Sequence, residues 1–304
     1  MLTPEQHLRR LQRPEGPVDV VMDTDTYNEI DDQYALAYLI RSPEKLRLQA
    51  IYAAPFFNGK STGPADGMEK SYEEIGRVLD LMGEESRKGD VFRGSTSYLP
   101  DERTPVDSPA ARDLVRRAMA RTPEEGPLYV IATGAITNVA SALLLEPALA
   151  DRIMVVWLGG NAMDWPDARE FNLQQDVAAG RVLFLSGAPV VQLPCMGVVS
   201  AFTTTGPELR HWLSGKNSLC DYLVDVTEKE AEFCSMGPCW SRPIWDVTAV
   251  AWLLGGFTED RLAPCPVPQP DHRMSYDTSR PPIRYVYHIY RDRLFEDLFR
   301  KLSR

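Results

Sequence analysis

The sequence has no excess of basic residues and few histidines. It contains 33 Lys and Arg against 43 Asp and Glu, which gives a formal net charge of −10. Nucleic-acid-binding proteins normally present a basic face, so this balance argues against a nucleic acid as the partner. The four histidines are His7, His211, His272 and His288. None lies in the motifs described below, and we expect each to have a surface or core role.

Cysteines and long apolar runs are also scarce. The five cysteines are Cys195, Cys220, Cys234, Cys239 and Cys265, and none forms a CxxC pair. An odd number in a long chain, together with an N-terminus that does not resemble a signal peptide, predicts reduced thiols and a cytoplasmic location. A zinc site at Cys234 and Cys239 is not expected, because partner ligands are missing. No apolar run reaches the roughly 20 residues of a membrane span, so no membrane is expected as partner.

The order of the apolar segments predicts an α/β fold. Strands and helices alternate, which favours a mostly parallel central sheet flanked by helices, in a single domain over residues 1–304. Loops are expected at 59–71 and 265–282, which are rich in Gly, Ser or Pro. Strands are expected at 18–22, 48–54, 90–94, 128–132, 153–158, 189–193 and 283–290, and helices at 34–39, 72–82, 108–121, 139–145 and 291–302, with 200–240 mostly helical.

An acidic cluster follows the first expected strand. Asp23, Asp25, Glu29, Asp31 and Asp32 lie within ten residues, where a strand ends and a helix begins. Ligands bind at this carboxyl edge of open α/β sheets. Carboxylates held close together raise one another's pKa, and a hard divalent cation such as Ca²⁺ relieves the repulsion. Capping of the helix by Asp31 and Asp32 is the alternative, but it does not explain Asp23 and Asp25.

The segment DTDTYNEIDDQYAL resembles the N-terminal fingerprint DxDxGxDDxxA of the inosine–uridine-preferring nucleoside hydrolase family. The resemblance implies the nucleoside hydrolase-like fold, with Asp25 and Asp32 as Ca²⁺ ligands and Asp31 as a ligand of the ribose. The spacer TYNEI is two residues longer than the family's usual spacer and lacks its Gly. The loop must therefore take a different path between the two acid pairs.

Two further segments extend the resemblance. Thr133 precedes Gly134 in a TGxxTN segment, where the family uses the backbone carbonyl of this residue as a Ca²⁺ ligand. Glu170 and Asn172 belong to an EFN segment, which in the family binds ribose hydroxyls. If this segment is extended, both side chains can face one pocket. The alternatives are a capped strand–helix junction at Thr133 and a solvated loop at Glu170.

At several other positions the resemblance leaves alternatives open. Asn58 follows a strand end, where the family has a ribose-binding Asn, although an ordinary turn Asn would also fit. Either Asn161 or Asp164 could replace the family's 5′-hydroxyl ligand. The His-Gly loop that often covers the substrate is absent after Gly94, so Tyr98 or Arg103 could close the pocket instead.

Near the C-terminus, Trp245 and Asp246 precede an apolar helix. Asp246 matches the acid that completes the family's Ca²⁺ shell, although it could be a simple helix N-cap. Many family members have a leaving-group His immediately before this Asp. Purine-specific members have a Trp that stacks on the base, so Trp245 predicts a preference for purines.

The combined resemblance implies Ca²⁺-dependent hydrolysis of the N-glycosidic bond of ribonucleosides, in a homodimer or homotetramer. Asp25 would take the proton of the attacking water. Two alternatives remain open from the sequence. Asp23 and Asp25, which follow a strand, also match the two acids of the DxDxT motif of haloacid-dehalogenase-type Mg²⁺-dependent phosphatases. A non-catalytic ribonucleoside-binding protein could have kept the metal ligands and lost the leaving-group acid.

Overall fold

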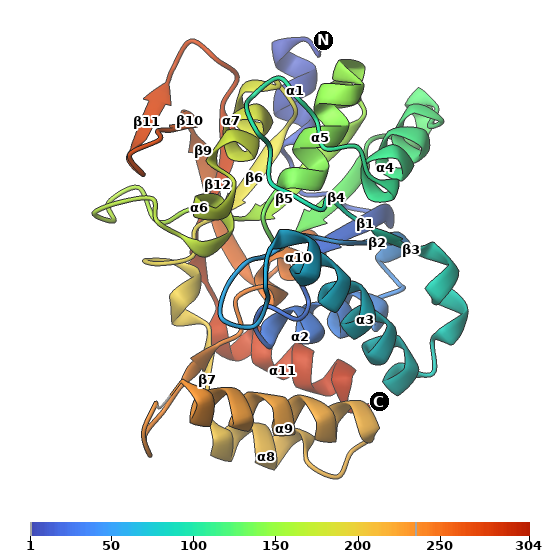
Figure 1. Ribbon diagram of the computed structural model, residues 1–304, viewed down its shortest axis with the longest axis vertical. Helices are drawn as coiled ribbons and strands as arrows, with labels where there is room; N and C mark the ends of the chain where they lie inside the picture. Colours follow the sequence, from blue (N-terminus) through green and yellow to red (C-terminus); the bar gives the residue numbers. More distant parts are fainter. Residues whose placement is uncertain (1, 235) are drawn as a thin grey trace.

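The computed structural model describes residues 2–234 and 236–304, and an eight-stranded sheet forms its centre (Figure 1). The strand order is β3-β2-β1-β4-β5-β6-β12-β9. All neighbouring pairs in it are parallel except β12 and β9, which are antiparallel. The strands are β1 (Val18–Thr24), β2 (Leu46–Ala53), β3 (Val91–Arg93), β4 (Leu128–Ala132), β5 (Ile153–Leu158), β6 (Val190–Leu193), β9 (Thr258–Ala263) and β12 (Ile283–Ile289).

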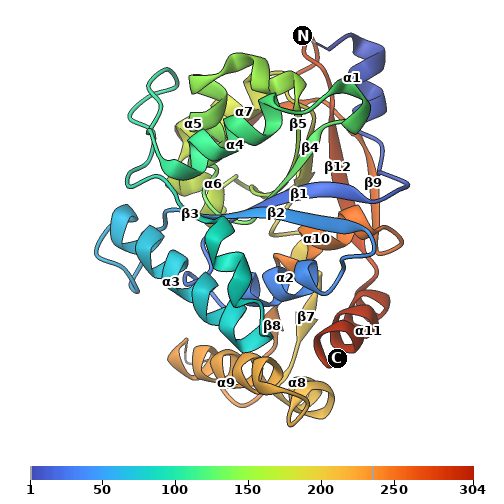
Figure 2. The ribbon, with the colours of Figure 1, turned by 90° about the vertical axis from the view of Figure 1, so that its right-hand side faces the viewer.

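Helices cover both faces of this sheet (Figures 1 and 2). One face is covered by α4 (Pro109–Met119), α5 (Thr137–Leu145) and α7 (Val177–Leu185). The other is covered by α2 (Asp31–Ile40), α3 (Pro64–Met82), α10 (Val247–Leu254) and α11 (Arg291–Leu302), with α8 (Gly206–Leu213) and α9 (Ser218–Phe233) packed outside them. The remaining α-helices and strands described are α1 (Pro4–Arg10), α6 (Phe171–Gln175), the pair β7 (Thr203–Thr204) with β8 (Arg242–Pro243), and the pair β10 (Cys265–Pro268) with β11 (Met274–Asp277).

The central strands are buried on both sides. In β4, Tyr129 and Ile131 belong to the core under α2 and α10, whereas Val130 and Ala132 belong to the core under α4, α5 and α7. Side chains alternate between the two faces of a strand, so a strand covered on both faces must be apolar at every position. This explains why β4 and β5 are uninterrupted apolar runs in the sequence and why the fold class was predictable.

Three expectations about the elements are wrong. Residues 59–71 are not a loop, because α3 begins at Pro64; a Cβ on Gly67 would lie 2.0 Å from the carbonyl oxygen of Phe56, so this Gly serves close packing. The expected loop at 265–282 contains the β10–β11 hairpin. Strand β9 was missed because half of its residues are charged and half are exposed, as is common on a sheet edge.

Within the described residues, no helix is both long enough and apolar enough to cross a bilayer.

The sheet register determines where polar side chains gather. Asp23 in β1 pairs with Ala132 in β4, and Ala132 pairs in turn with Trp157 in β5. The residues that follow these strands, among them Asp25 and Thr133, therefore emerge at one edge of the sheet. This is the edge at which open α/β sheets bind ligands.

Candidate active site

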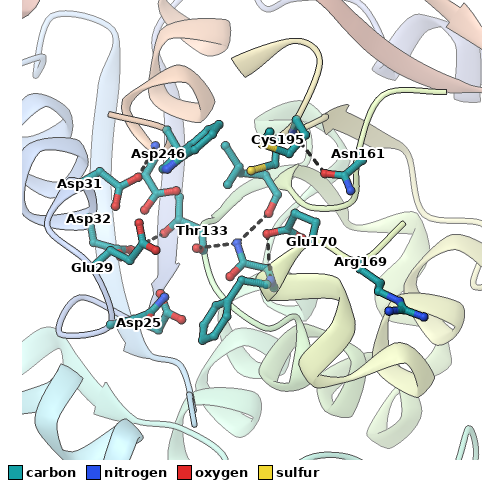
Figure 3. A pocket seen from close by; sticks show the side chains of 16 residues that line it. Asp25, Glu29, Asp31, Asp32, Thr133, Asn161, Arg169, Glu170, Cys195 and Asp246 are labelled. Carbon is teal, nitrogen blue, oxygen red and sulfur yellow. Dashed lines mark hydrogen bonds between the residues drawn. The ribbon is translucent and has the colours of Figure 1, made fainter. Parts of the chain in front are cut away.

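Three carboxylates from two helix starts form the densest acidic group of this edge. Asp31 and Asp32 lie in the first turn of α2, and Asp246 is the N-cap residue of α10. Ligand oxygens of the three side chains lie within 4.8 Å of one another, and all three side chains are buried (Figure 3). Positive helix N-termini favour these charges. Burial, together with neighbouring carboxylates, nevertheless raises the pKa of Asp31 and Asp246 well above the usual value.

Asp25, just after β1, has the least satisfied carboxylate of the site. It is 1% exposed, and neither of its carboxylate oxygens has a hydrogen-bond partner among residues 2–234 and 236–304. Burial raises its pKa well above the ordinary value, and the charge of Asp32 adds to this effect. Buried carboxylates normally pair with a cation or accept hydrogen bonds. The oxygen-only donor set and these orphaned atoms fit a hard divalent cation.

Thr133 connects the acidic cluster to the rest of the site. Its hydroxyl donates to Asp32 Oδ1 over 2.9 Å, and the hydroxyl of Thr24 donates to the same oxygen. Its carbonyl accepts a 3.0 Å hydrogen bond from Asn172 Nδ2. The next residue, Gly134, leaves room for the acid: a Cβ there would lie 3.1 Å from Cγ of Asp25. The TGxxTN glycine therefore lets Asp25 and Ala54 approach this backbone closely.

Asp23 lies below the cluster and is fully buried. Its Oδ1 accepts a 2.7 Å hydrogen bond from Asn138 Nδ2, and burial raises its pKa to about 7. Asn138 also receives the backbone N–H and the hydroxyl of Ser95 on its own oxygen. Asp23 does not line the pocket, so we infer that its role is structural, at the end of β1.

The EFN segment is not extended, contrary to the sequence-based expectation. Glu170 is the N-cap residue of α6, and Asn172 lies within this helix. The carboxylate of Glu170 accepts N–H groups from Gly160, Asn172 and Leu173 at 2.8, 2.8 and 2.9 Å. Burial raises its pKa to about 7. Glu170 therefore caps a helix at this segment. Both Glu170 and Asn172 nevertheless line the pocket.

Some of the remaining predicted residues line the pocket and others do not. Asn161 and Trp245 line it, whereas Asp164 is exposed and does not. Asn58 also lies outside the pocket lining. Its side chain donates to Asn28 Oδ1 over 2.7 Å and accepts from the backbone N–H of Lys60.

The two residues suggested as pocket covers do not line the pocket either. The hydroxyl of Tyr98 donates to Gln175, which also accepts the backbone N–H of Phe57. Arg103 is exposed. The structure therefore places Tyr98 as a tether between loops at this edge of the sheet.

The pocket also contains residues that the sequence reasoning did not select. Asn28, with Glu29, enters it from the lengthened TYNEI spacer, and Arg169 enters from the residue before EFN. Glu29 is paired with Arg242 on β8, and this pair holds the spacer against β8. The two-residue insertion was the available signal for Asn28. Arg169 had no signal beyond its place before EFN, and Cys195, which also lines the pocket, had none.

Comparison with known proteins decides the family. A model of the family described as "Inosine-uridine preferring nucleoside hydrolase" matches residues 20–274. The chain belongs to this family. It is therefore an N-ribosyl hydrolase that cleaves the N-glycosidic bond of ribonucleosides. Membership decides against both the phosphatase and the non-catalytic alternative.

Individual relatives of this nucleoside hydrolase differ in their named specificity. The pyrimidine-specific ribonucleoside hydrolase RihA of Citrobacter koseri is 27% identical over 249 residues, which cover 74% of this chain and 76% of that protein. A plant nucleoside hydrolase, PpNRh1, has the same fold at a TM-score of 0.75 and 20% identity, covering 94% of this chain and 99% of its own. The purine-preferring ribonucleoside hydrolase of Gardnerella vaginalis has a TM-score of 0.72 at 21% identity, covering 94% and 98%.

Replacement of Asn172 tests its predicted contact with ribose. We expect Asn172→Ala to lower kcat more than it raises KM, because a sugar contact that strengthens in the transition state acts on kcat. A lost hydrogen bond to a developing charge is worth about 1.5–3 kcal/mol, or roughly a 10- to 150-fold fall. Steady-state kinetics on inosine would measure this. Calcium binding should be titrated in parallel. Asn172 also donates to the carbonyl of Thr133, which is an expected Ca²⁺ ligand, so its loss could act through the metal. A pure KM effect would contradict the prediction.

Proposed function

We propose that this nucleoside hydrolase is Ca²⁺-dependent and that Asp25, Asp32, Asp246 and the carbonyl of Thr133 hold the ion. The observation that carries the proposal is the carboxylate of Asp25, buried beside Asp32 with both oxygens unpartnered. Carboxylates and a backbone carbonyl are the ligand set of Ca²⁺. When bound, the ion would act as a Lewis acid that lowers the pKa of water and binds hydroxyl oxygens.

The residues around the ion have distinct proposed roles. Asp25 accepts the proton of the attacking water as a general base. Asp31, Glu170 and Asn172 bind ribose hydroxyls, with Asn161 beside them in the pocket lining as the ligand of the 5′-hydroxyl. The positive charge that develops on the ribosyl group as the bond breaks is favoured by the surrounding carboxylates. Asn58 acts indirectly, through its bond to Asn28.

Trp245 supports a preference for purine bases. It lines the pocket next to Asp246, and no histidine is among the described residues that line this pocket. An indole ring has no proton to give near neutral pH, so it cannot be the leaving-group acid. It can stack on a base, a contact worth on the order of 1–3 kcal/mol, and a purine offers the larger face and an N7 that solvent can protonate.

A reducing-sugar assay over a panel of nucleosides, with and without chelator, tests the proposal. We expect turnover to disappear with chelator and to return with Ca²⁺. Inosine should have a higher kcat/KM than uridine, and Trp245→Ala should reduce the value for inosine more than that for uridine. Equal values, or a preference for uridine, would contradict the stacking argument. Turnover that survives chelation would contradict the metal assignment.

The proposed assembly rests on the resemblance, and the proposed location rests on the cysteines and the N-terminal sequence. A homodimer or homotetramer and a cytoplasmic location stay predictions. Sedimentation velocity would test the first.

A further inference from the structure

Charge is distributed unevenly along the active-site pocket. Its carboxylates gather at one end, where the metal and the ribose diol are proposed to bind, and Glu170 lies farther along with its oxygens bonded to backbone N–H groups. Arg169 is the single basic residue among the described residues that line this pocket, and it lies on the opposite side from the acidic cluster (Figure 3). The carboxylates of the acidic end are Asp25, Glu29, Asp31, Asp32 and Asp246.

The guanidinium of Arg169 is available for a ligand. No carboxylate in the described parts of the chain forms an ion pair with it within 4.0 Å, although the neighbouring Asp167 accepts its backbone N–H over 2.9 Å. The main chain is therefore held by a local bond while the side chain stays free. Arg242, near the acidic end, contrasts with it, because Glu29 already occupies its guanidinium.

The chemistry of a ribonucleoside indicates which group would reach Arg169. In the proposed site the 2′- and 3′-hydroxyls face the acidic end and the base lies against Trp245. The 5′-carbon is the one substituent that then extends away from both, toward the other side of the pocket. A guanidinium binds a phosphate through two parallel hydrogen bonds, and its charge complements that of the anion.

We propose that Arg169 forms a phosphate subsite and that the enzyme hydrolyses ribonucleoside 5′-monophosphates as well as ribonucleosides. This inference rests on the proposed orientation of the nucleoside. In the reaction, the bond between C1′ and the base nitrogen breaks, the oxygen of water bonds to C1′, and the base leaves with the proton. The products are the free base and ribose 5-phosphate, and no phosphate ester is cleaved.

The test compares inosine with inosine 5′-monophosphate on the metal-loaded full-length protein. Both substrates release hypoxanthine, so one chromatographic assay measures kcat/KM for each. We expect Arg169→Ala to lower the ratio of kcat/KM for the nucleotide to that for the nucleoside at least tenfold. Arg169→Lys keeps the charge without the planar fork and should lower it less. Added salt should reduce the nucleotide value more than the nucleoside value.

Arg273→Ala is the matched control, because this arginine is exposed between β10 and β11 and does not line the pocket. It should leave the ratio unchanged. Release of hypoxanthine from inosine but not from its 5′-monophosphate would overturn the inference and leave the proposed function intact, as would a ratio that Arg169→Ala does not change. Failure to hydrolyse any ribonucleoside or nucleotide would overturn both.

Discussion

Asp32→Ala is expected to abolish bound Ca²⁺ and nearly all turnover. Asp32 lies at the centre of the acidic cluster. Its Oδ1 accepts from Thr24 and Thr133, and its carboxylate neighbours those of Asp25, Asp31 and Asp246. Removing it leaves a cavity where a central ligand is proposed to lie. Because a bound metal contributes several kcal/mol to stabilising the transition state, kcat/KM should fall by roughly three orders of magnitude or more.

Two further variants separate this effect from damage to the fold. Asp32→Asn retains an oxygen for the hydroxyls of Thr24 and Thr133 but removes the charge, so it should fold normally and still lose the metal. Asp164→Ala removes an exposed aspartate of the same edge that does not line the pocket, and it should keep both metal and activity. Calcium content by isothermal titration and atomic emission gives the readout. Stoichiometric Ca²⁺ in Asp32→Ala would show that the ligand assignment is wrong.

Asp25→Asn is expected to lose activity while the metal-free protein becomes more stable. The substitution keeps the shape of the side chain and removes its ability to accept the proton of water. Loss of a general base lowers kcat by roughly 10²–10⁴-fold. Because the carboxylate of Asp25 is buried, unpartnered and close to Asp32, the neutral amide also removes a repulsion. The unfolding temperature of the chelated variant should therefore exceed that of the chelated wild type.

Asp25 is proposed to be both the general base and a metal ligand. The experiment must therefore separate loss of proton transfer from loss of the metal. Kinetics at saturating Ca²⁺, with occupancy checked by titration, make this separation. If saturating Ca²⁺ restores wild-type kcat, Asp25 is not the base. If the chelated variant unfolds at a lower temperature than chelated wild type, the claim that its buried charge destabilises the metal-free fold is wrong.

Much of this protein follows from short stretches of sequence. The apolar runs at 128–132 and 153–158 gave their strands with the same bounds, because strands covered by helices on both faces must be apolar throughout. The family could be identified from the acidic motif and from TGxxTN, EFN and the Trp245–Asp246 pair. Each of these motifs lies directly at the end of a strand or the start of a helix, where local sequence and function coincide.

Elements defined by long-range packing were not predictable in this way. The first turn of α3 packs against Phe56 through Gly67, and β9 depends on pairing with a strand that follows it in sequence. The Gly, Ser and Pro content of 59–71 made that segment resemble a loop. The charged residues of 258–263 left no apolar pattern that indicates a strand. Neither contact leaves a periodic pattern in its own segment, so neither could be recognised locally.

The sequence by itself determined the fold class and the family, and it predicted most of the acids and amides that line the pocket, because these depend on residue type and on position relative to strand ends. Only the tertiary structure decided how those groups are satisfied. It shows that Glu170 is bonded to three backbone N–H groups, that Asp25 is left with two unpartnered oxygens, and that Asn161 lines the pocket while Asp164 does not. It also places Arg169 opposite the acidic cluster. The physical reason is that hydrogen bonds, burial and charge separation depend on distances between segments far apart in the chain, which no local motif encodes.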